Sequence, residues 1–388
     1  MGKARQKSLN IERILGLSAL ILIALSWYIG GLRSRADVLP TMKQLVPHAR
    51  QFQILEGDMY AVWADEKGRR LLGYIKISQA MGYGGPMTIA VSTDPDAKIT
   101  GIGILDHKDT PTYFTRILED GFIKSILGKS YQNDLLLDQD IDGVSGATKS
   151  SQAMVESVRN AVRAIAVSQL GIDIPAENNQ KIKFALPEII LLLLFTLGIF
   201  ARSKNVKRKS SLRWVSLLTG LVCLGFVYDN PLTISMVNQL LLGFWPQWHT
   251  SLYLYLLVGG ILILFIVEGK NPYCRWICPF GAAQDCIGKI TNARSRSIGS
   301  FRGFLKWTHR FITLLAILVA LYYRSPGFTG YEVFGALFKM WGSAFQFIVI
   351  ALVFFMSLYT IRPWCNFLCP IRPVDDYFRM MRKWIKEI

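Results

Sequence analysis

The chain has 388 residues, of which 51% are hydrophobic, and it carries a formal net charge of +17. This length is sufficient for two folded units. The hydrophobic residues gather in runs of about 17–20, the length that crosses a bilayer, which argues against a wholly water-soluble protein. We expect no nucleic-acid partner, because the basic residues lie where membrane topology requires them.

Six apolar runs predict transmembrane helices, at residues 14–32, 185–201, 213–228, 251–268, 311–323 and 343–361. The fifth run is the weakest prediction. Excess Lys and Arg mark the cytoplasmic side of a membrane. Such residues are abundant in 1–13, 202–213, 270–310 and 362–388, whereas the alternate connections 229–250 and 324–342 hold only Arg324 and Lys339. Both termini are therefore expected inside, and the segment between the first two helices outside.

The pattern divides the chain into three parts. Residues 1–33 are an N-terminal tail and a transmembrane anchor, which we expect to be uncleaved because Tyr28–Arg33 is a poor signal-peptidase site. Residues 34–183 form an outer domain that contains none of the six cysteines. Residues 184–388 form a five-helix membrane domain. Few cysteines, mostly on the cytoplasmic side, suggest cofactor ligands and not structural disulfides.

The outer domain is predicted to be α+β, with strands first and helices after them. Alternating or apolar segments predict strands at 59–64, 71–78, 87–93 and 99–105, separated by turn residues. Helical spacing follows in 112–127 and 149–170. The fold class is therefore a polytopic α-helical membrane protein with an inserted exocytoplasmic α+β domain.

Three loops of this domain are candidates for one ligand site. Gly82–Pro86 lies between two predicted strands, and its glycines permit close approach of the backbone to a ligand. Asp106–Pro111 follows a strand. Ser145–Thr148 opens a helix, whose unpaired N–H groups and partial positive charge suit a phosphate. Each loop alone is common, but their order and spacing together favour a binding site.

Together the three loops resemble those of FMN-binding domains. In that family the last residue of Ser-Gly-Ala-Thr carries FMN through a phosphoester bond, which implies covalent FMN on Thr148. The chain has Asp109 where the family usually has Glu, and Thr112 where many members have Gly. The other residues that the resemblance places around the flavin are Gly82, Tyr83, Gly85, His107, Asp109, Thr110, Ser145, Gly146 and Ala147.

Two copies of Cys-x3-Cys-Pro follow apolar helices at predicted cytoplasmic ends, with Cys274 and Cys278 in one and Cys365 and Cys369 in the other. Four thiolates suit a [4Fe–4S] cluster. Zinc is the competing metal, although structural zinc sites usually use Cys-x2-Cys. The two pairs share one cluster, or each nucleates its own. Cys286 is either a further ligand or a bystander.

The membrane half resembles the NosR/NirI family, including its Cys-Pro-Phe-Gly-Ala signature at residues 278–282. The short form, with one flavin domain and two Cys-x3-Cys-Pro motifs, is more similar to PceC-type proteins, which are associated with reductive dehalogenase systems. The resemblance implies covalent FMN and iron–sulfur centres in one membrane chain.

These features predict an electron-transfer protein of the cytoplasmic membrane, with the FMN domain outside and the cysteine motifs inside. The hydrocarbon core is about 30 Å thick, too far for one efficient electron-transfer step, so menaquinone, ubiquinone or another carrier is expected to bridge it. The other expected partners are membrane lipid, an exocytoplasmic reductase and a flavin transferase. The alternative function is a redox-sensing regulator or maturation factor for such a reductase.

Overall fold

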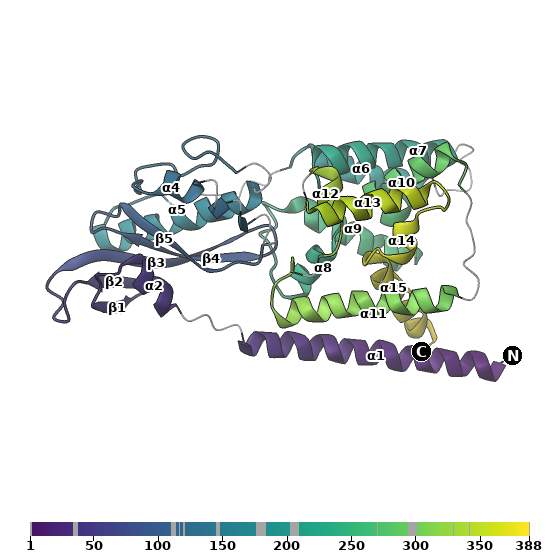
Figure 1. The fold of residues 1–388 in the computed structure, drawn as a ribbon, viewed down its shortest axis with the longest axis horizontal. Coiled ribbons are helices and arrows are strands. Elements are labelled where there is room, and N and C mark those ends of the chain that lie inside the picture. The colour runs from purple at the N-terminus through teal and green to yellow at the C-terminus, as the bar shows by residue number, and fades with distance from the viewer. Residues whose placement is uncertain are drawn as a thin grey trace.

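The computed structural model describes residues 2–33, 38–109, 114–115, 117–118, 121–144, 148–175, 184–201, 209–269, 271–293, 301–328, 330–340 and 342–387. The chain has two parts, a sheet domain and a helical half, which lie end to end (Figure 1). The first helix, α1 (Gly2–Arg33), precedes the sheet domain in sequence but runs alongside the helical half. The sheet domain is therefore inserted between helices, as predicted.

The sheet domain contains one antiparallel sheet whose five strands are neighbours in chain order. They are β1 (Gln51–Leu55), β2 (Met59–Trp63), β3 (Leu71–Met81), β4 (Pro86–Thr93) and β5 (Ile99–Asp106). The four predicted strands are confirmed within three residues at each end. The largely exposed edge strand β1 was not predicted, nor was the short helix α2 (Leu39–Leu45), which has Pro in its first turn.

Strand β4 is the centre of this domain, because both of its faces are covered. Ile89 and Val91 point into a core formed with α5 (Thr148–Leu170), and Ala90 points into a second core with Met42 of α2. A strand that is buried on both faces tends to be apolar at successive positions, as β4 is over Ile89–Val91. The predicted helix over 112–127 is partly described, and its regular part is α4 (Phe122–Ile126).

The helical half contains a helix at each of the five apolar runs predicted for it. The described helices are α6 (Leu186–Phe200), α7 (Lys209–Thr219), η1 (Gly220–Val227), α8 (Ile234–Leu241), α9 (Leu252–Glu268), η2 (Tyr273–Ile277), α10 (Pro279–Ile290), α11 (Phe301–Tyr322), α12 (Phe334–Phe338), α13 (Ala344–Ser357), α14 (Pro363–Phe367) and α15 (Ile371–Glu387). Helix α11 begins ten residues before the predicted run, because basic residues interrupt its apolar first turns.

Three helices among the described residues are long and apolar enough to cross a membrane: 11–33, 209–227 and 303–322. The apolar helices 186–200, 252–267 and 344–357 are shorter. The protein is therefore a membrane protein with at least these three candidate spans.

Helix α1 packs along α11 through small residues. Gly30 has no room for a side chain, since a Cβ atom there would lie 2.3 Å from the carbonyl oxygen of Leu321. Ser26 donates a hydrogen bond of 2.6 Å to the carbonyl of Leu318. Small residues allow the backbones of membrane helices to approach closely. The anchor is thus joined to the helical half by contacts along its length.

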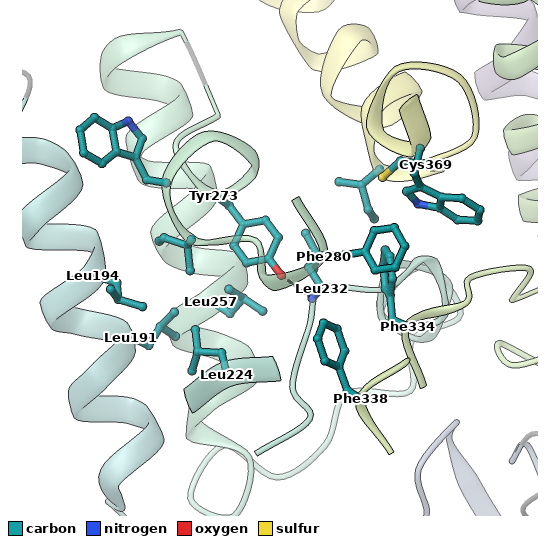
Figure 2. Packing of buried hydrophobic residues seen from close by; sticks show 14 of the residues in the cluster. Leu191, Leu194, Leu224, Leu232, Leu257, Tyr273, Phe280, Phe334, Phe338 and Cys369 are labelled. Carbon is teal, nitrogen blue, oxygen red and sulfur yellow. Dashed lines mark hydrogen bonds between the residues drawn. The ribbon is translucent and has the colours of Figure 1, made fainter. Parts of the chain in front are cut away.

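The core of the helical half is rich in aromatic residues (Figure 2). Tyr273 is buried, and its hydroxyl accepts a hydrogen bond of 2.8 Å from the N–H of Leu232. Phe280 contacts Trp364 with ring centroids 5.6 Å apart. Tyr273 and Phe280 flank the first cysteine pair, and Trp364 precedes the second. One core therefore brings together two motifs that are about 90 residues apart in sequence.

Candidate functional site

The first two predicted flavin loops are joined through Asp109. Its Oδ1 accepts a hydrogen bond of 2.6 Å from the N–H of Gly84. A Cβ atom on Gly82 would lie 2.8 Å from both carboxylate oxygens of Asp109, and one on Gly84 would lie 2.1 Å from the carbonyl oxygen of Lys108. Glycine is therefore required at both positions for the loops to meet.

The third loop is followed directly by α5, and the first turn of α5 contacts Asp109. The side chain of Ser150 forms a hydrogen bond with Asp109, and Ser150 lies two residues after Thr148, the first residue of α5. Ser145, Gly146, Ala147 and Thr110 lie outside the described residues, whereas Thr148 is described and is exposed. The structure thus brings Gly82, Asp109 and the start of α5 together.

Asp109 and His107 are polar groups in an apolar setting. Asp109 is 2% exposed, and burial raises the pKa of its carboxyl group, an effect that the hydrogen bonds from Gly84 and Ser150 partly offset. The ring of His107 stacks on Phe114, with centroids 3.6 Å apart. Burial lowers the pKa of His107, which favours the neutral imidazole at pH 7. A flat neutral surface of this kind suits an aromatic ligand.

The four predicted cysteine ligands are close to one another. Burial raises the pKa of all four thiols, and for Cys274, Cys365 and Cys369 the charge of another of these thiols raises it further. The pKa of Cys365 rises to about 12. Such thiols remain protonated unless a metal displaces the proton. Cys286 shows no such coupling to the other thiols, and Cys223 lies within η1.

Hydrogen-bond donors point at three of these sulfur atoms. The side-chain amide of Asn271 lies 3.7 Å from the sulfur of Cys274, the N–H of Gly281 lies 3.5 Å from that of Cys278, and the amide of Gln284 lies 3.4 Å from that of Cys365. Donors to sulfur stabilise thiolates and tune iron–sulfur centres. The donor set therefore fits an iron–sulfur cluster.

No three Cys, His, Asp or Glu side chains of the described chain lie close enough to hold a single metal ion. A zinc ion needs four ligand atoms at about 2.0–2.3 Å. In a four-iron cluster each thiolate binds a different iron atom, so the sulfur atoms lie farther apart. Zinc and a four-iron cluster therefore require different spacings of the four thiols.

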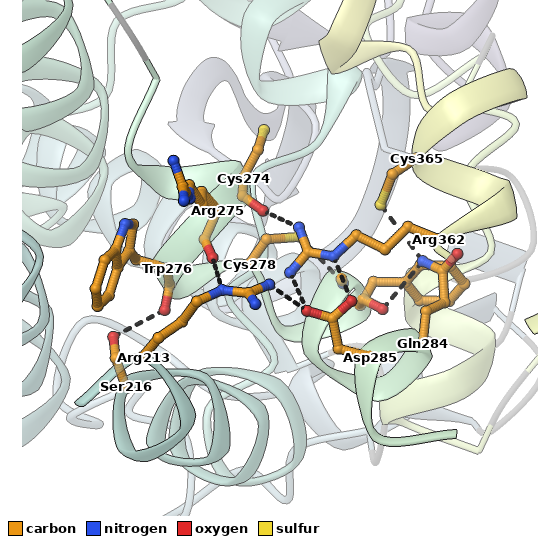
Figure 3. A network of polar contacts seen from close by, with 12 residues as sticks. Arg213, Ser216, Cys274, Arg275, Trp276, Cys278, Gln284, Asp285, Arg362 and Cys365 are labelled. Carbon is orange, nitrogen blue, oxygen red and sulfur yellow. Dashed lines mark hydrogen bonds and ion pairs between the residues drawn. The ribbon is translucent and has the colours of Figure 1, made fainter. Parts of the chain in front are cut away.

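An arginine–aspartate network joins the two motifs, and sequence reasoning missed it (Figure 3). Arg362 binds Asp285 through two nitrogen atoms, at 2.8 and 2.7 Å, and donates to the carbonyl of Cys274 at 2.5 Å. Arg213 binds the same carboxylate at 2.5 Å. The only sequence signal was a charged residue beside each motif.

His309 lies within α11 and is 6% exposed. Its Nε2 lies 2.8 Å from the carbonyl oxygen of Cys369 and donates to it. Helix α11 is thereby linked to the second cysteine pair. Hydropathy indicates the depth of a residue in a membrane but not the group that its side chain faces, so the sequence pattern did not indicate this contact.

A cavity of about 270 Å³ lies where the sheet domain meets the helical half. Ile77, Leu105 and Phe244 form apolar walls, and Asp106, Lys108 and Arg324 are polar. Lys108 is buried and pairs with Asp106 at 2.7 Å. These six residues come from distant parts of the chain, so no local pattern predicted the cavity.

Two families match separate parts of the chain. Residues 82–163 match the FMN-binding domain, and residues 250–299 and 342–387 match the 4Fe-4S binding domain. The FMN match contains all three loops of the sheet domain. Each segment of the 4Fe-4S match contains one cysteine pair.

Curated relatives share only part of the chain. One subunit of the proton-translocating ferredoxin:NAD(+) oxidoreductase complex of Clostridium ljungdahlii is 29% identical over 132 residues, which cover 32% of this chain and 70% of that protein. NirI of Paracoccus denitrificans is 27% identical over 207 residues, which cover 47% of this chain and 30% of NirI. One subunit of the ion-translocating oxidoreductase complex of Aliivibrio fischeri is 31% identical over 90 residues, which cover 21% of this chain and 43% of that protein.

The chain therefore spans less than a third of NirI and less than half of the Aliivibrio protein. It has the two kinds of redox centre that membrane electron transfer through flavin and iron–sulfur groups requires. The chain thus combines an FMN-binding domain and a 4Fe-4S binding domain in one membrane protein that is similar to NirI, which is consistent with a NosR/NirI-type iron–sulfur flavoprotein.

Proposed function

We propose that this protein passes electrons between a quinol or a cytoplasmic donor and a reductase outside the cytoplasmic membrane, through covalent FMN on Thr148 and iron–sulfur centres at the four cysteines. The observation that carries the proposal is the convergence on Asp109. Gly84 and Ser150 both bind this carboxylate, so the glycine loop lies beside the helix turn that begins at Thr148.

The residues around Thr148 have distinct roles in this proposal. The hydroxyl of Thr148 would carry the phosphate, and the N-terminus of the 23-residue helix α5 would stabilise its charge. Tyr83 and His107 would flank the ring, and the glycine loop would approach it closely. FMN supplies exchange of one or two electrons, and its covalent attachment retains it outside the cell.

The thiols of the four cysteines would hold the cluster, which supplies one-electron transfer. Asn271, Gly281 and Gln284 would donate hydrogen bonds to the sulfur atoms, and Arg362 would place positive charge beside them. The 4Fe-4S family match and the mutual electrostatic effects of the neighbouring thiols support this assignment.

We propose six membrane spans, with the sheet domain outside and both termini inside. The charge pattern supports this topology. So does the arrangement in Figure 1, where the two termini lie at the end of the helical half that is remote from the sheet domain. The three shorter helices would span the membrane together with the turns and short helices that extend them.

Helix α11 indicates the scale of the distance that electrons would cross. His309 of α11 is hydrogen-bonded to the second cysteine pair, and thirteen residues separate it from the end of α11 at Tyr322. At 1.5 Å per residue this is roughly 20 Å, compared with about 30 Å for the hydrocarbon core. The remaining gap favours a quinol as the intermediate carrier.

The cavity at the junction is our candidate for the quinol headgroup. Its apolar walls suit the ring, and Asp106, Lys108 and Arg324 offer polar groups for the two oxygens. Val38 and Arg324 line it, and each lies shortly after the proposed outer end of a long helix, α1 or α11. A quinol in the membrane could reach this position without crossing the sheet domain.

The first test is the flavin tether. Full-length protein, produced with a flavin transferase, is run on a denaturing gel and viewed under ultraviolet light beside Thr148→Ala and the exposed control Thr100→Ala. We expect a fluorescent band in the wild type and the control, and none in Thr148→Ala. Fluorescence that survives in Thr148→Ala would refute this attachment site.

The second test is electron transfer itself. A menaquinol analogue is mixed with oxidised protein in detergent, and flavin absorbance is followed by stopped flow. We expect rapid bleaching in the wild type and at least tenfold slower bleaching in Phe244→Ala. No exchange in the wild type would contradict quinol oxidation, and slow exchange with altered partner binding would favour the redox-sensing alternative.

A further inference from the structure

The sheet domain contacts the helical half through the loop that contains Tyr83. A Cβ atom on Gly85 would lie 3.0 Å from the ring of Phe244. On the other side of the loop, the amide of Gln239 lies 3.9 Å from the sulfur of Met81. Tyr83 is therefore held at the boundary between the two parts of the molecule.

Two lysines from different parts of the chain approach the ring of Tyr83. The Nζ of Lys149 lies 5.7 Å from the ring centroid, and the Nζ of Lys339 lies 5.5 Å from it. Ammonium groups at this range are attracted to an aromatic ring. Lys149 directly follows Thr148, whereas Lys339 follows α12 of the helical half. The shared ring therefore places Lys339 near the proposed attachment site.

Asp229 holds Lys339 in this position. Its Oδ2 lies 3.0 Å from the Nζ of Lys339, and the side chain of Asp229 is 15% exposed. The other oxygen, Oδ1, is buried and has no hydrogen-bond partner in the described part of the chain. Buried polar atoms normally have a partner. An acceptor left open beside Tyr83 is an independent sign of a ligand with a polar hydrogen.

The position of Lys339 in the sequence is also unusual. The two connections expected outside the membrane hold only Arg324 and Lys339 as basic residues. Basic residues are scarce on the outer side of membrane proteins. Both of these residues face the sheet domain, Arg324 at the cavity and Lys339 at Tyr83. Their placement is explained if they serve a site at this junction.

We propose that Lys339 and Asp229 of the helical half complete the FMN site, with Lys339 as a positive charge that favours the reduced flavin. This inference rests on the proposed attachment of FMN to Thr148. Oxidation of a quinol releases two electrons and two protons. A flavin that takes both electrons and one proton becomes one unit more negative, and the second proton passes to solvent. A nearby ammonium group stabilises that form, and partial burial limits screening by solvent. Asp229 moderates the effect by neutralising part of the charge of Lys339.

The proposal predicts that substitutions of Lys339 and Asp229 shift the reduction potential of the flavin in opposite directions. In redox titrations of full-length protein, Lys339→Gln should raise the oxidised-to-reduced flavin ratio at a fixed potential about tenfold, which is about 30 mV for a two-electron couple. Asp229→Asn should lower that ratio. Lys339→Arg should stay near the wild type, because it retains the charge.

Lys129→Gln is the matched control, since Lys129 pairs with Asp140 within the sheet domain, away from this junction. Each variant is first checked for in-gel flavin fluorescence. Unchanged potentials in Lys339→Gln and Asp229→Asn, or shifts of the same sign, would overturn the inference while leaving the flavin tether intact. Absence of fluorescence in the wild type would instead refute the proposed function itself.

Discussion

At the scale of single residues, Arg362 connects the two cysteine pairs. It stands three residues before Cys365, binds Asp285 through two nitrogen atoms and donates to the carbonyl of Cys274. Its φ of +50° is a left-handed conformation that non-glycine residues seldom adopt, and the residue after it is Pro363. Local strain of this kind persists only where surrounding contacts hold it.

We predict that Arg362→Gln destabilises the motif region by about 3 kcal/mol, because breaking a buried ion pair leaves a charge uncompensated. Arg213 still binds Asp285, which places the effect at the low end of the usual range. Iron content and visible absorbance of the purified protein should fall by more than half. Arg379→Gln is the control, since its pair with Asp375 is exposed on the arginine side. Equal iron loss in both variants would contradict a specific role for Arg362.

The raised pKa of Asp109 predicts that the stability of the sheet domain depends on pH. Its folded-state pKa is raised by burial, so between the ordinary carboxyl pKa and the raised value the folded state binds more protons than the unfolded state. Stability of the sheet domain should therefore fall as pH rises through this window, and Asp109→Asn should remove that fall. Urea midpoints of the full chain at pH 4, 5.5 and 7 measure it, with exposed Asp96→Asn as control. A fall in Asp109→Asn as steep as in the wild type would refute this origin.

At the scale of elements, α5 is both the proposed carrier of the flavin and half of the domain core. One face packs on β3 and β4, and Met154, Val158 and Val162 are fully buried. Thr148 is its first residue. The position of the attachment site therefore depends on how the whole of α5 packs. At 1.5 Å per residue, the C-terminal end of this helix lies about 33 Å from Thr148.

We predict that Met154→Ala destabilises the sheet domain by about 2–5 kcal/mol, the range for removal of a large buried side chain. Exposed Gln152→Ala should change stability by less than about 0.5 kcal/mol. Hydrogen exchange of the peptide that contains β4 is the measurement, because β4 lies directly under α5. If β4 remained equally protected in both variants, α5 would not be the stabilising element.

At the scale of the whole molecule, the topology can be tested with cysteine labelling. The first 222 residues contain no native cysteine. We expect a membrane-impermeant maleimide to label Lys67→Cys, in the turn after β2, in intact cells. Lys383→Cys in α15 should react only after the membrane is opened. Wild-type protein in intact cells is the blank, and labelling of Lys383→Cys from outside would reverse the proposed orientation.

The sequence by itself determined the features that depend on local pattern. Apolar runs located the helices, alternation located β2 to β5, and residue types at fixed spacing located the loops at Gly82, His107 and Thr148 and the cysteine pairs. The family matches confirm the two kinds of cofactor. Short-range patterns suffice here because backbone geometry and ligand spacing act over a few residues.

Only the tertiary structure decided which distant residues meet. Lys339 reaches Tyr83 across more than 250 positions, and Arg362 reaches Asp285 across 77. The burial of His309 and the cavity at Phe244 likewise depend on how the parts pack. No pattern along the chain encodes such pairs, because a charge or an aromatic ring is equally compatible with solvent until packing gives it a partner.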